Sequence, residues 1–257
     1  MESLFLLPSY FLPFLLVWMR LLGLFLIAPV FNSRLIPIPV KVGLSFMIAL
    51  VMALVILPVD SQWQFDGRFF LALFSEIVLG LVLGLVAGLI LSCVQIAGEI
   101  IDFQMGFSYV NIVDPLSNLG VSVMGQFYFV LTTIYYLGVG GHRLSLLGLA
   151  RSFELVPLGS FAVKEEMAYS FIDLVGEVTV IGIQVGAPII VALFLSNFTL
   201  AILSRAIPQM NVFIVGLPLN IGIGFFLALI TLPYFLPVVN RVISLFFQAF
   251  YRFLGVP

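Results

Sequence analysis

The feature that most limits how this chain can fold is the length of its apolar segments. From Phe69 to Ala97 the only charged residue is Glu76. A helix that continued from Phe69 to Asp102 would be on the order of 50 Å long, which exceeds the ~30 Å hydrocarbon core of a bilayer. We therefore expect this helix to tilt strongly in a membrane or to protrude from it.

The rest of the chain is similar in character, so it cannot supply the polar surface of a soluble protein. Hydrophobic residues make up 63% of the sequence and charged residues 9%, whereas soluble domains carry about 25% charged residues. The net charge of −2 gives no basic signature for nucleic-acid binding. These values predict an integral membrane protein, or a subunit buried in a larger assembly, without a nucleic-acid partner.

Proline, glycine and charged residues divide the chain into six apolar segments. They predict an all-α subunit over residues 1–257, with about six long, proline-broken helices arranged as helical hairpins within a larger membrane-associated assembly. The expected helices are Leu4–Val30, Val42–Leu57, Phe69–Asp102 or beyond, Val121–Leu137, Val178–Leu203 and Asn220–Leu236 or further. The expected interruptions are a hinge at Phe31–Lys41, a more polar connecting segment at 138–177, a break at Arg205–Leu219 and a short amphipathic tail containing Arg241 and Arg252.

Glycines at four-residue spacing mark one face of the third expected helix. Gly80, Gly84 and Gly88 form a doubled small-xxx-small pattern, which allows two helices to approach closely. This pattern predicts a helix–helix packing seam. Arg20 lies in the first apolar segment, where we expect it to face a partner or to extend toward the membrane surface.

The segment 97–119 contains an unusual concentration of polar residues between apolar neighbours. Charge in hydrocarbon costs at least a few kcal/mol, roughly 3 on insertion scales, so these residues must be paired or face water or protein. If the third helix continues to Gly106, then Gln95, Glu99, Asp102 and Gly106 share one stripe. We interpret the polar residues as an anchoring stripe at the helix end; its members are Gln95, Glu99, Asp102, Gln104 and Asp114.

The residues that follow predict a loop of unusual composition. Asp114-Pro115 and Ser117-Asn118 are typical of turns, yet Phe107, Tyr109 and their neighbours are bulky and apolar. An apolar loop between polar anchors could fill a hole. Alternatively, Glu99 and Asp102 could pair with arginine or backbone donors and only pin the helix end.

Two other functional classes fit the sequence less well. An enzyme would need a nucleophile, metal set or phosphate loop beside Glu99 and Asp102, and the sequence offers none, so we expect no catalytic residue, metal or cofactor. Cys93 is the only cysteine and His142 the only histidine, which argues against disulfide and zinc sites. An ion-coupled secondary transporter using Glu99 and Asp102 stays open as the alternative.

Two long motifs resemble the FliR family of flagellar export-gate proteins, which is related to the virulence type III secretion export apparatus. The first motif is AGEIIDFQMGFSYVNIVDP at Ala97–Pro115, and the second is IPQMNVFIVGLPLNIGIG at Ile207–Gly224. GGH at Gly140–His142 and SFELVP at Ser152–Pro157 also look like that family, in the expected order. The resemblance extends over nearly the whole chain.

The resemblance implies a function that composition cannot show. Members of this family are structural and not enzymatic, and one copy joins FliP-like, FliQ-like and FlhB-like subunits in the gate that passes unfolded flagellar proteins. The implied location is the bacterial inner membrane, in the flagellar basal body. The implied plug runs from Gly106 to about Gly120; its gate residues are Gly106, Phe107, Ser108, Tyr109, Val110, Asn111 and Ile112.

Overall fold

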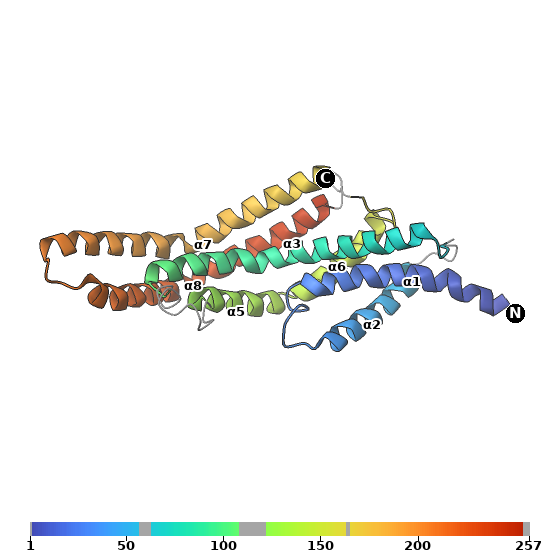
Figure 1. The fold of residues 1–257 in the computed structure, drawn as a ribbon, viewed down its shortest axis with the longest axis horizontal. Helices are drawn as coiled ribbons and strands as arrows, with labels where there is room; N and C mark the ends of the chain where they lie inside the picture. Colours follow the sequence, from blue (N-terminus) through green and yellow to red (C-terminus); the bar gives the residue numbers. More distant parts are fainter. Residues whose placement is uncertain (1, 57–62, 108–121, 163–164, 254–257) are drawn as a thin grey trace. The chain divides into compact units, whose positions relative to one another are not determined.

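The computed structural model describes residues 2–56, 63–107, 122–162 and 165–253, and the regular secondary structure of this part consists of helices joined by turns and irregular segments, with no strand (Figure 1). The helices are α1 (Glu2–Ile27), α2 (Ile38–Ile56), α3 (Gly67–Met105), α5 (Val123–Gly138), α6 (Gly141–Leu155), α7 (Glu165–Ala206) and α8 (Val212–Phe253). Within the described residues, five helices are long and apolar enough to cross a membrane, or up to six if α5 and α6 count as one broken span. The expected all-α class with about six long apolar segments is confirmed.

The connecting segment 138–177 is itself mostly helical. Its first helix, α6, buries residues at the spacing of one helix face; they are Gly141, Ser145, Gly148, Leu149, Ser152 and Phe153. Most of these side chains are small, so the face can lie close to its neighbours. α7 begins at Glu165, well before the expected start at Val178, because an acidic first turn suits the positive end of the helix dipole.

The break expected at Arg205–Leu219 is wrong over most of its length. Only residues 207–211 separate α7 from α8. The side chain of Asn211 accepts hydrogen bonds from the backbone N–H groups of Phe213 and Ile214, which starts the helix at Val212. The helix then continues through Pro218, Pro233 and Pro237 to Phe253, so the residues expected to form a separate tail belong to α8.

The chain divides into two compact units, each built from segments distant in sequence. The first contains residues 1–89, 137–174 and 245–257, and the second contains residues 90–136 and 175–244. α3, α5, α7 and α8 each contribute residues to both units.

The first unit is organised around a buried ion pair between α1 and α3. Arg20 and Glu76 both have fully buried side chains, and the guanidinium donates to both carboxylate oxygens. Arg20 also donates to the Ser152 hydroxyl at 3.0 Å and the Val156 carbonyl at 3.1 Å. The Glu76 carboxylate accepts a further bond from the Gly159 N–H at 2.7 Å. Four parts of the chain thus meet at one pair of charges.

The glycines of α3 allow α1 to approach closely enough for this pair to form. A Cβ atom built on Gly80 would lie 2.1 Å from the Arg20 carbonyl oxygen, and one on Gly84 would lie 2.9 Å from the Leu24 carbonyl oxygen. A Cβ atom on Gly88 would lie 3.8 Å from its nearest neighbour, the Ile27 carbonyl oxygen. The tightest contact is therefore at Gly80, one turn from Glu76.

The second unit packs the later part of α3 against α5, α7 and α8. A Cβ atom on Gly182 of α7 would lie 2.4 Å from the carbonyl oxygen of Cys93, so these two backbones nearly touch. Tyr128 of α5 stacks on Phe235 of α8 with ring centroids 5.2 Å apart. The carboxyl-terminal end of α3 lies within this unit.

The buried ion pair should make a large contribution to stability. Replacing Arg20 with Met should lower the free energy of unfolding by about 3–5 kcal/mol, because Glu76 would keep a buried and uncompensated charge. The exposed Arg151–Glu154 pair offers a control, and Glu154→Ala should cost less than about 1 kcal/mol. Thermal unfolding of the purified protein in detergent measures both, and equal losses would contradict the prediction.

The glycine seam should tolerate substitution unevenly. Gly80→Ala should sharply reduce folded protein, because the backbone of α1 cannot yield to the added methyl group, whereas Gly88→Ala should be accepted since its Cβ would make an ordinary contact. The amount and melting temperature of each variant in membranes provide the measurement. Similar behaviour of the two variants would show that helix spacing at Gly80 is not limiting.

Candidate functional site

α3 ends at a glycine with a left-handed backbone conformation. Gly106 has φ of 95°, which side-chain-bearing residues rarely adopt. The N–H groups of Gly106 and Phe107 both donate to the carbonyl oxygen of Asp102, each at 3.1 Å. These bonds satisfy a carbonyl in the last turn and stop the helix at Met105. The first gate residue predicted from the family resemblance is thus the helix terminator.

The side chain of Asp102 begins the next described helix. Its carboxylate accepts the backbone N–H of Met124 at 3.0 and 3.1 Å and the hydroxyl of Ser122. The Ser122 oxygen in turn accepts the N–H of Gly125 at 2.7 Å, which is an amino-terminal helix cap. A carboxylate is also favoured near the positive end of the α5 dipole.

One residue therefore holds both ends of the segment between α3 and α5. The Asp102 carbonyl closes α3 and its carboxylate opens α5, twenty residues further along the chain. The two helices also touch directly, since a Cβ atom on Gly98 would lie 2.4 Å from the Cα and N atoms of Gly125. We call this arrangement of Asp102, Gly106, Ser122 and Gly125 the clasp.

Burial explains the electrostatics of the clasp. Asp102 is 2% exposed, and it lies beyond the apolar window Gly67–Leu89 that could cross a membrane. Desolvation raises the pKa of its carboxyl group, while the hydrogen bonds from Ser122 and the backbone of Met124 oppose that rise. The carboxyl group is bound by backbone and hydroxyl donors. Of the two kinds of partner that the sequence left open for this residue, arginine or backbone donors, the structure has backbone donors.

The other predicted stripe residues have different environments. Gln95 donates to Glu99 at 3.1 Å within an exposed turn of α3, so this pair is separate from the buried Asp102. In the described part of the chain, the side-chain oxygen of Gln104 is buried without a hydrogen-bond partner. The remaining predicted gate and stripe residues fall outside the described ranges; they are Ser108, Tyr109, Val110, Asn111, Ile112 and Asp114.

The two sequence motifs, about a hundred residues apart, meet at the end of α3. Met105 of the first motif occupies the space over Gly224 of the second, where an added Cβ would lie 2.6 Å from the methionine sulfur. Phe107 packs edge-on against Phe225 with centroids 6.2 Å apart. The sequence did not indicate these partners, although Ser122 directly before an apolar run is a recognisable cap signal.

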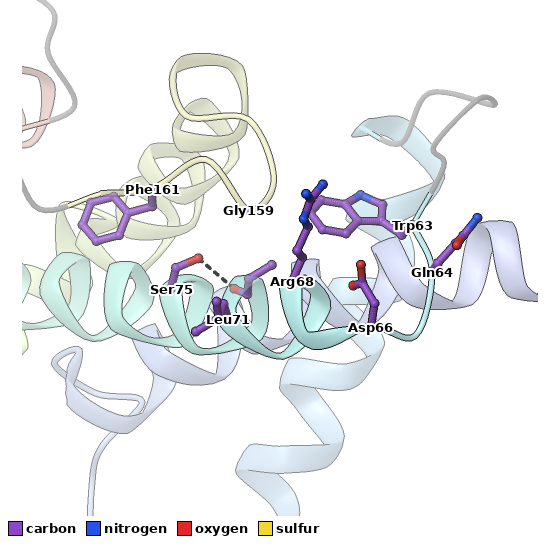
Figure 2. A pocket seen from close by; sticks show the side chains of 9 residues that line it. Trp63, Gln64, Asp66, Arg68, Leu71, Ser75, Gly159 and Phe161 are labelled. Atoms are coloured by element: carbon purple, nitrogen blue, oxygen red, sulfur yellow. Dashed lines mark hydrogen bonds between the residues drawn. The ribbon is translucent and has the colours of Figure 1, made fainter.

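A separate polar recess lies in the first unit, beside the start of α3 (Figure 2). Its volume is about 780 Å³, and its lining includes Trp63, Asp66, Arg68, Ser75 and Phe161. Asp66 is already engaged, because it caps α3 through the N–H of Phe69 at 3.0 Å. No group of three histidine, cysteine or acidic residues within the described ranges could hold a metal ion. The recess contains none of the predicted site residues.

Comparison with known proteins agrees with the motifs. Residues 11–246 match the family described as "Bacterial export proteins, family 1". The flagellar biosynthetic protein FliR of Bacillus subtilis is 34% identical over 235 residues, covering 90% of each chain. FliR of Escherichia coli is 30% identical over 242 residues, covering 93% of this chain and 90% of that protein.

A virulence-associated protein is also similar. The surface presentation of antigens protein SpaR of Shigella sonnei is 27% identical over 215 residues, covering 83% of this chain and 82% of its own. These similarities, with the membrane-span candidates, confirm the expected family and membrane location and identify a transport component from a family that is not enzymatic. The chain belongs to the FliR family of bacterial export proteins.

Proposed function

We propose that this chain is a structural subunit of the flagellar export gate in the bacterial inner membrane, at the basal body. One copy joins FliP-like, FliQ-like and FlhB-like subunits around a pore for unfolded flagellar proteins, and the segment Gly106–Gly120 plugs the resting pore. The observation that carries the proposal is the clasp, because Asp102 fixes both ends of that segment.

The clasp suits a plug that moves while its supports stay in place. The Asp102 bonds and the Gly98–Gly125 contact tie α3 to α5 independently of the residues between them. Substrate could therefore displace the intervening segment without separating the helices. Phe107, Tyr109, Val110 and Ile112 are the candidate side chains that block ions, and Asp102 anchors them.

The exposed apolar surface supports assembly with other subunits and lipid. Leu54 and Val55 of α2 are each 82% exposed, and Phe226 and Tyr234 of α8 are more than half exposed. Patches of this kind in a soluble monomer mark interaction surfaces. We assign them to contacts with the FliP-like and FliQ-like neighbours and with membrane lipid.

An ion-coupled transporter is the second candidate, and the geometry favours it less. Transporter sites use helices that unwind near the middle of the membrane, whereas α7 continues through Pro188 and Pro208 lies in the turn after it. The two carboxylates proposed as an ion site also differ, because Glu99 is exposed and Asp102 caps a helix.

Deleting Ser108–Asn118 should raise ion leakage and leave the complex assembled. Phe107 and Ser122 both contact Asp102, so the three residues left between them can rejoin the ends, since each spans up to about 3.6 Å. Leakage is measured in cells that express the other export genes, with co-purification of the partner subunits as the assembly control. A deletion variant that assembles and stays tight to ions would exclude the plug.

Asp102 and Glu99 provide a matched pair for testing the anchor. Asp102→Ala should strongly reduce motility and export, because it leaves the Met124 N–H unpaired in a buried site at a cost of about 1–3 kcal/mol. Glu99→Ala should have little effect, since it removes an exposed pair, and Asp102→Asn should be intermediate because it keeps an acceptor. Full motility of Asp102→Ala would remove its anchoring role.

A further inference from the structure

A cavity distinct from the polar recess lies at the hinge between α1 and α2, within the first unit. Its volume is about 450 Å³, and apolar side chains such as Phe25 and Leu26 make up most of its lining. Two cations, Arg34 and Lys41, and the amide of Asn32 also line it. Cavities of this size hold small ligands, whose orientation is set by a few polar groups. The hinge therefore combines an apolar volume with two positive charges.

The two cations have no acidic residue near them in the chain. Aspartate and glutamate are absent between Glu2 and Asp60, and no acidic residue of the described part lines the cavity. The two ion pairs found among the described residues lie elsewhere. Arg34 is exposed and Lys41 is half-buried, so both charges are available to an anionic ligand.

The cavity lies where two candidate membrane spans end. The apolar window of α1 is Tyr10–Ile27, and that of α2 is Ile38–Ile56. The two helices pack as a hairpin, in which the Trp18 side chain donates to the Ser45 hydroxyl at 3.2 Å (Figure 1). Because both windows end at the hinge, we expect the cavity to lie at a membrane surface, at the level of the lipid headgroups.

Exposed apolar side chains flank the two cations. Leu35 is 92% exposed and Ile38 is 74% exposed. Apolar side chains next to basic ones are typical of protein segments that lie at the boundary between headgroups and acyl chains. The surroundings of the cavity therefore also suit contact with lipid.

Backbone hydrogen bonds hold the shape of the hinge. The Asn32 N–H donates to the Ala28 carbonyl at 3.0 Å, and the Ile36 N–H donates to the Ser33 carbonyl at 3.1 Å. Between them Val30 has φ of 70°, which a β-branched residue rarely adopts. Such a conformation persists only where the surrounding structure fixes it, so the cavity is formed before any ligand binds.

We propose that this cavity binds an anionic phospholipid, with its phosphodiester between Arg34 and Lys41 and part of an acyl chain against Phe25 and Leu26. Basic pockets between membrane helices bind such headgroups, and a guanidinium can donate two parallel hydrogen bonds to one phosphate. An acidic protein segment would meet only the two charges, whereas a phospholipid meets the charges and the apolar lining. The site is independent of the proposed plug.

Lipid binding to the full-length chain, purified in detergent and stripped of lipid, tests the proposal by native mass spectrometry. Phosphatidylglycerol should bind more tightly than phosphatidylcholine. The double variant Arg34→Gln/Lys41→Gln should lose about thirtyfold in affinity for phosphatidylglycerol, because each cation near anionic headgroups contributes about fivefold. Its affinity for phosphatidylcholine should hardly change. Arg34→Lys keeps the charge and should retain most of the binding.

A matched control removes two charges from other parts of the chain. Arg68→Gln/Arg143→Gln replaces exposed cations of α3 and α6, and this variant should bind phosphatidylglycerol as the unaltered chain does. Equal losses in the two double variants would show general attraction to charge and overturn the site. The site is also wrong if the unaltered chain binds phosphatidylglycerol no better than phosphatidylcholine.

Two further measurements identify other occupants. Inorganic phosphate should not displace phosphatidylglycerol, and displacement at similar concentrations would indicate a site for free anions instead of lipid. Partner subunits should co-purify unchanged with Arg34→Gln/Lys41→Gln. If that variant loses its partners but binds phosphatidylglycerol normally, the cations face an acidic segment of a partner and the lipid site is wrong. Should it not accumulate, Arg34→Gln alone, at an exposed position, decides by a loss of about fivefold.

Discussion

The packing of the first unit of this chain depends on a buried ion pair between α1 and α3. Arg20 and Glu76 are both withdrawn from water, and isolated charges in such a site would cost several kcal/mol each. The structure avoids that cost because the two charges pair with each other and with groups of α6 and the turn after it, namely the Ser152 hydroxyl, the Val156 carbonyl and the Gly159 N–H. α6 and the turn after it are thereby tied to α1 and α3. Charged residues make up only 9% of the sequence, and this one pair of them joins four segments of the chain.

The second unit uses the same chemistry with one charge instead of two. Asp102 accepts a backbone N–H from the start of α5, as Glu76 accepts one from Gly159. Backbone donors at helix ends and turns have no partner within their own element, so a single carboxylate can satisfy them and join two elements. Glycines are needed at both sites, since Gly80 and Gly98 bring the backbones within reach. At both sites, therefore, a buried carboxylate and a close approach between helices occur together.

Local features were predictable from the sequence, and contacts between distant residues were not. The length of α3 and the break between Gly138 and Gly141 follow from a continuous apolar run and from glycine, which are both features of the local sequence. The sequence predicts that Arg20 faces a partner or extends toward the membrane surface, but its partner Glu76 is 56 residues away and no local pattern indicates it. The start of α8 was misplaced because Pro218 and Gly216 suggest a break, whereas the Asn211 cap and packing against Leu200 sustain a helix. Tertiary packing outweighed propensity there.

The predicted anchoring stripe shows that local sequence spacing also does not determine which side chains of the candidate site are buried. Gln95, Glu99 and Asp102 share a helix face by angle, yet Asp102 is buried while Glu99 is exposed. Helical spacing determines which residues lie together on α3, but the neighbouring helices determine which of them are covered. α5 covers Asp102 because Gly98 and Gly125 let it approach at that turn. The proposed plug would need ends that stay in place, and the covered carboxylate of Asp102 suits that role because it is bound by the Met124 N–H and the Ser122 hydroxyl at the start of α5.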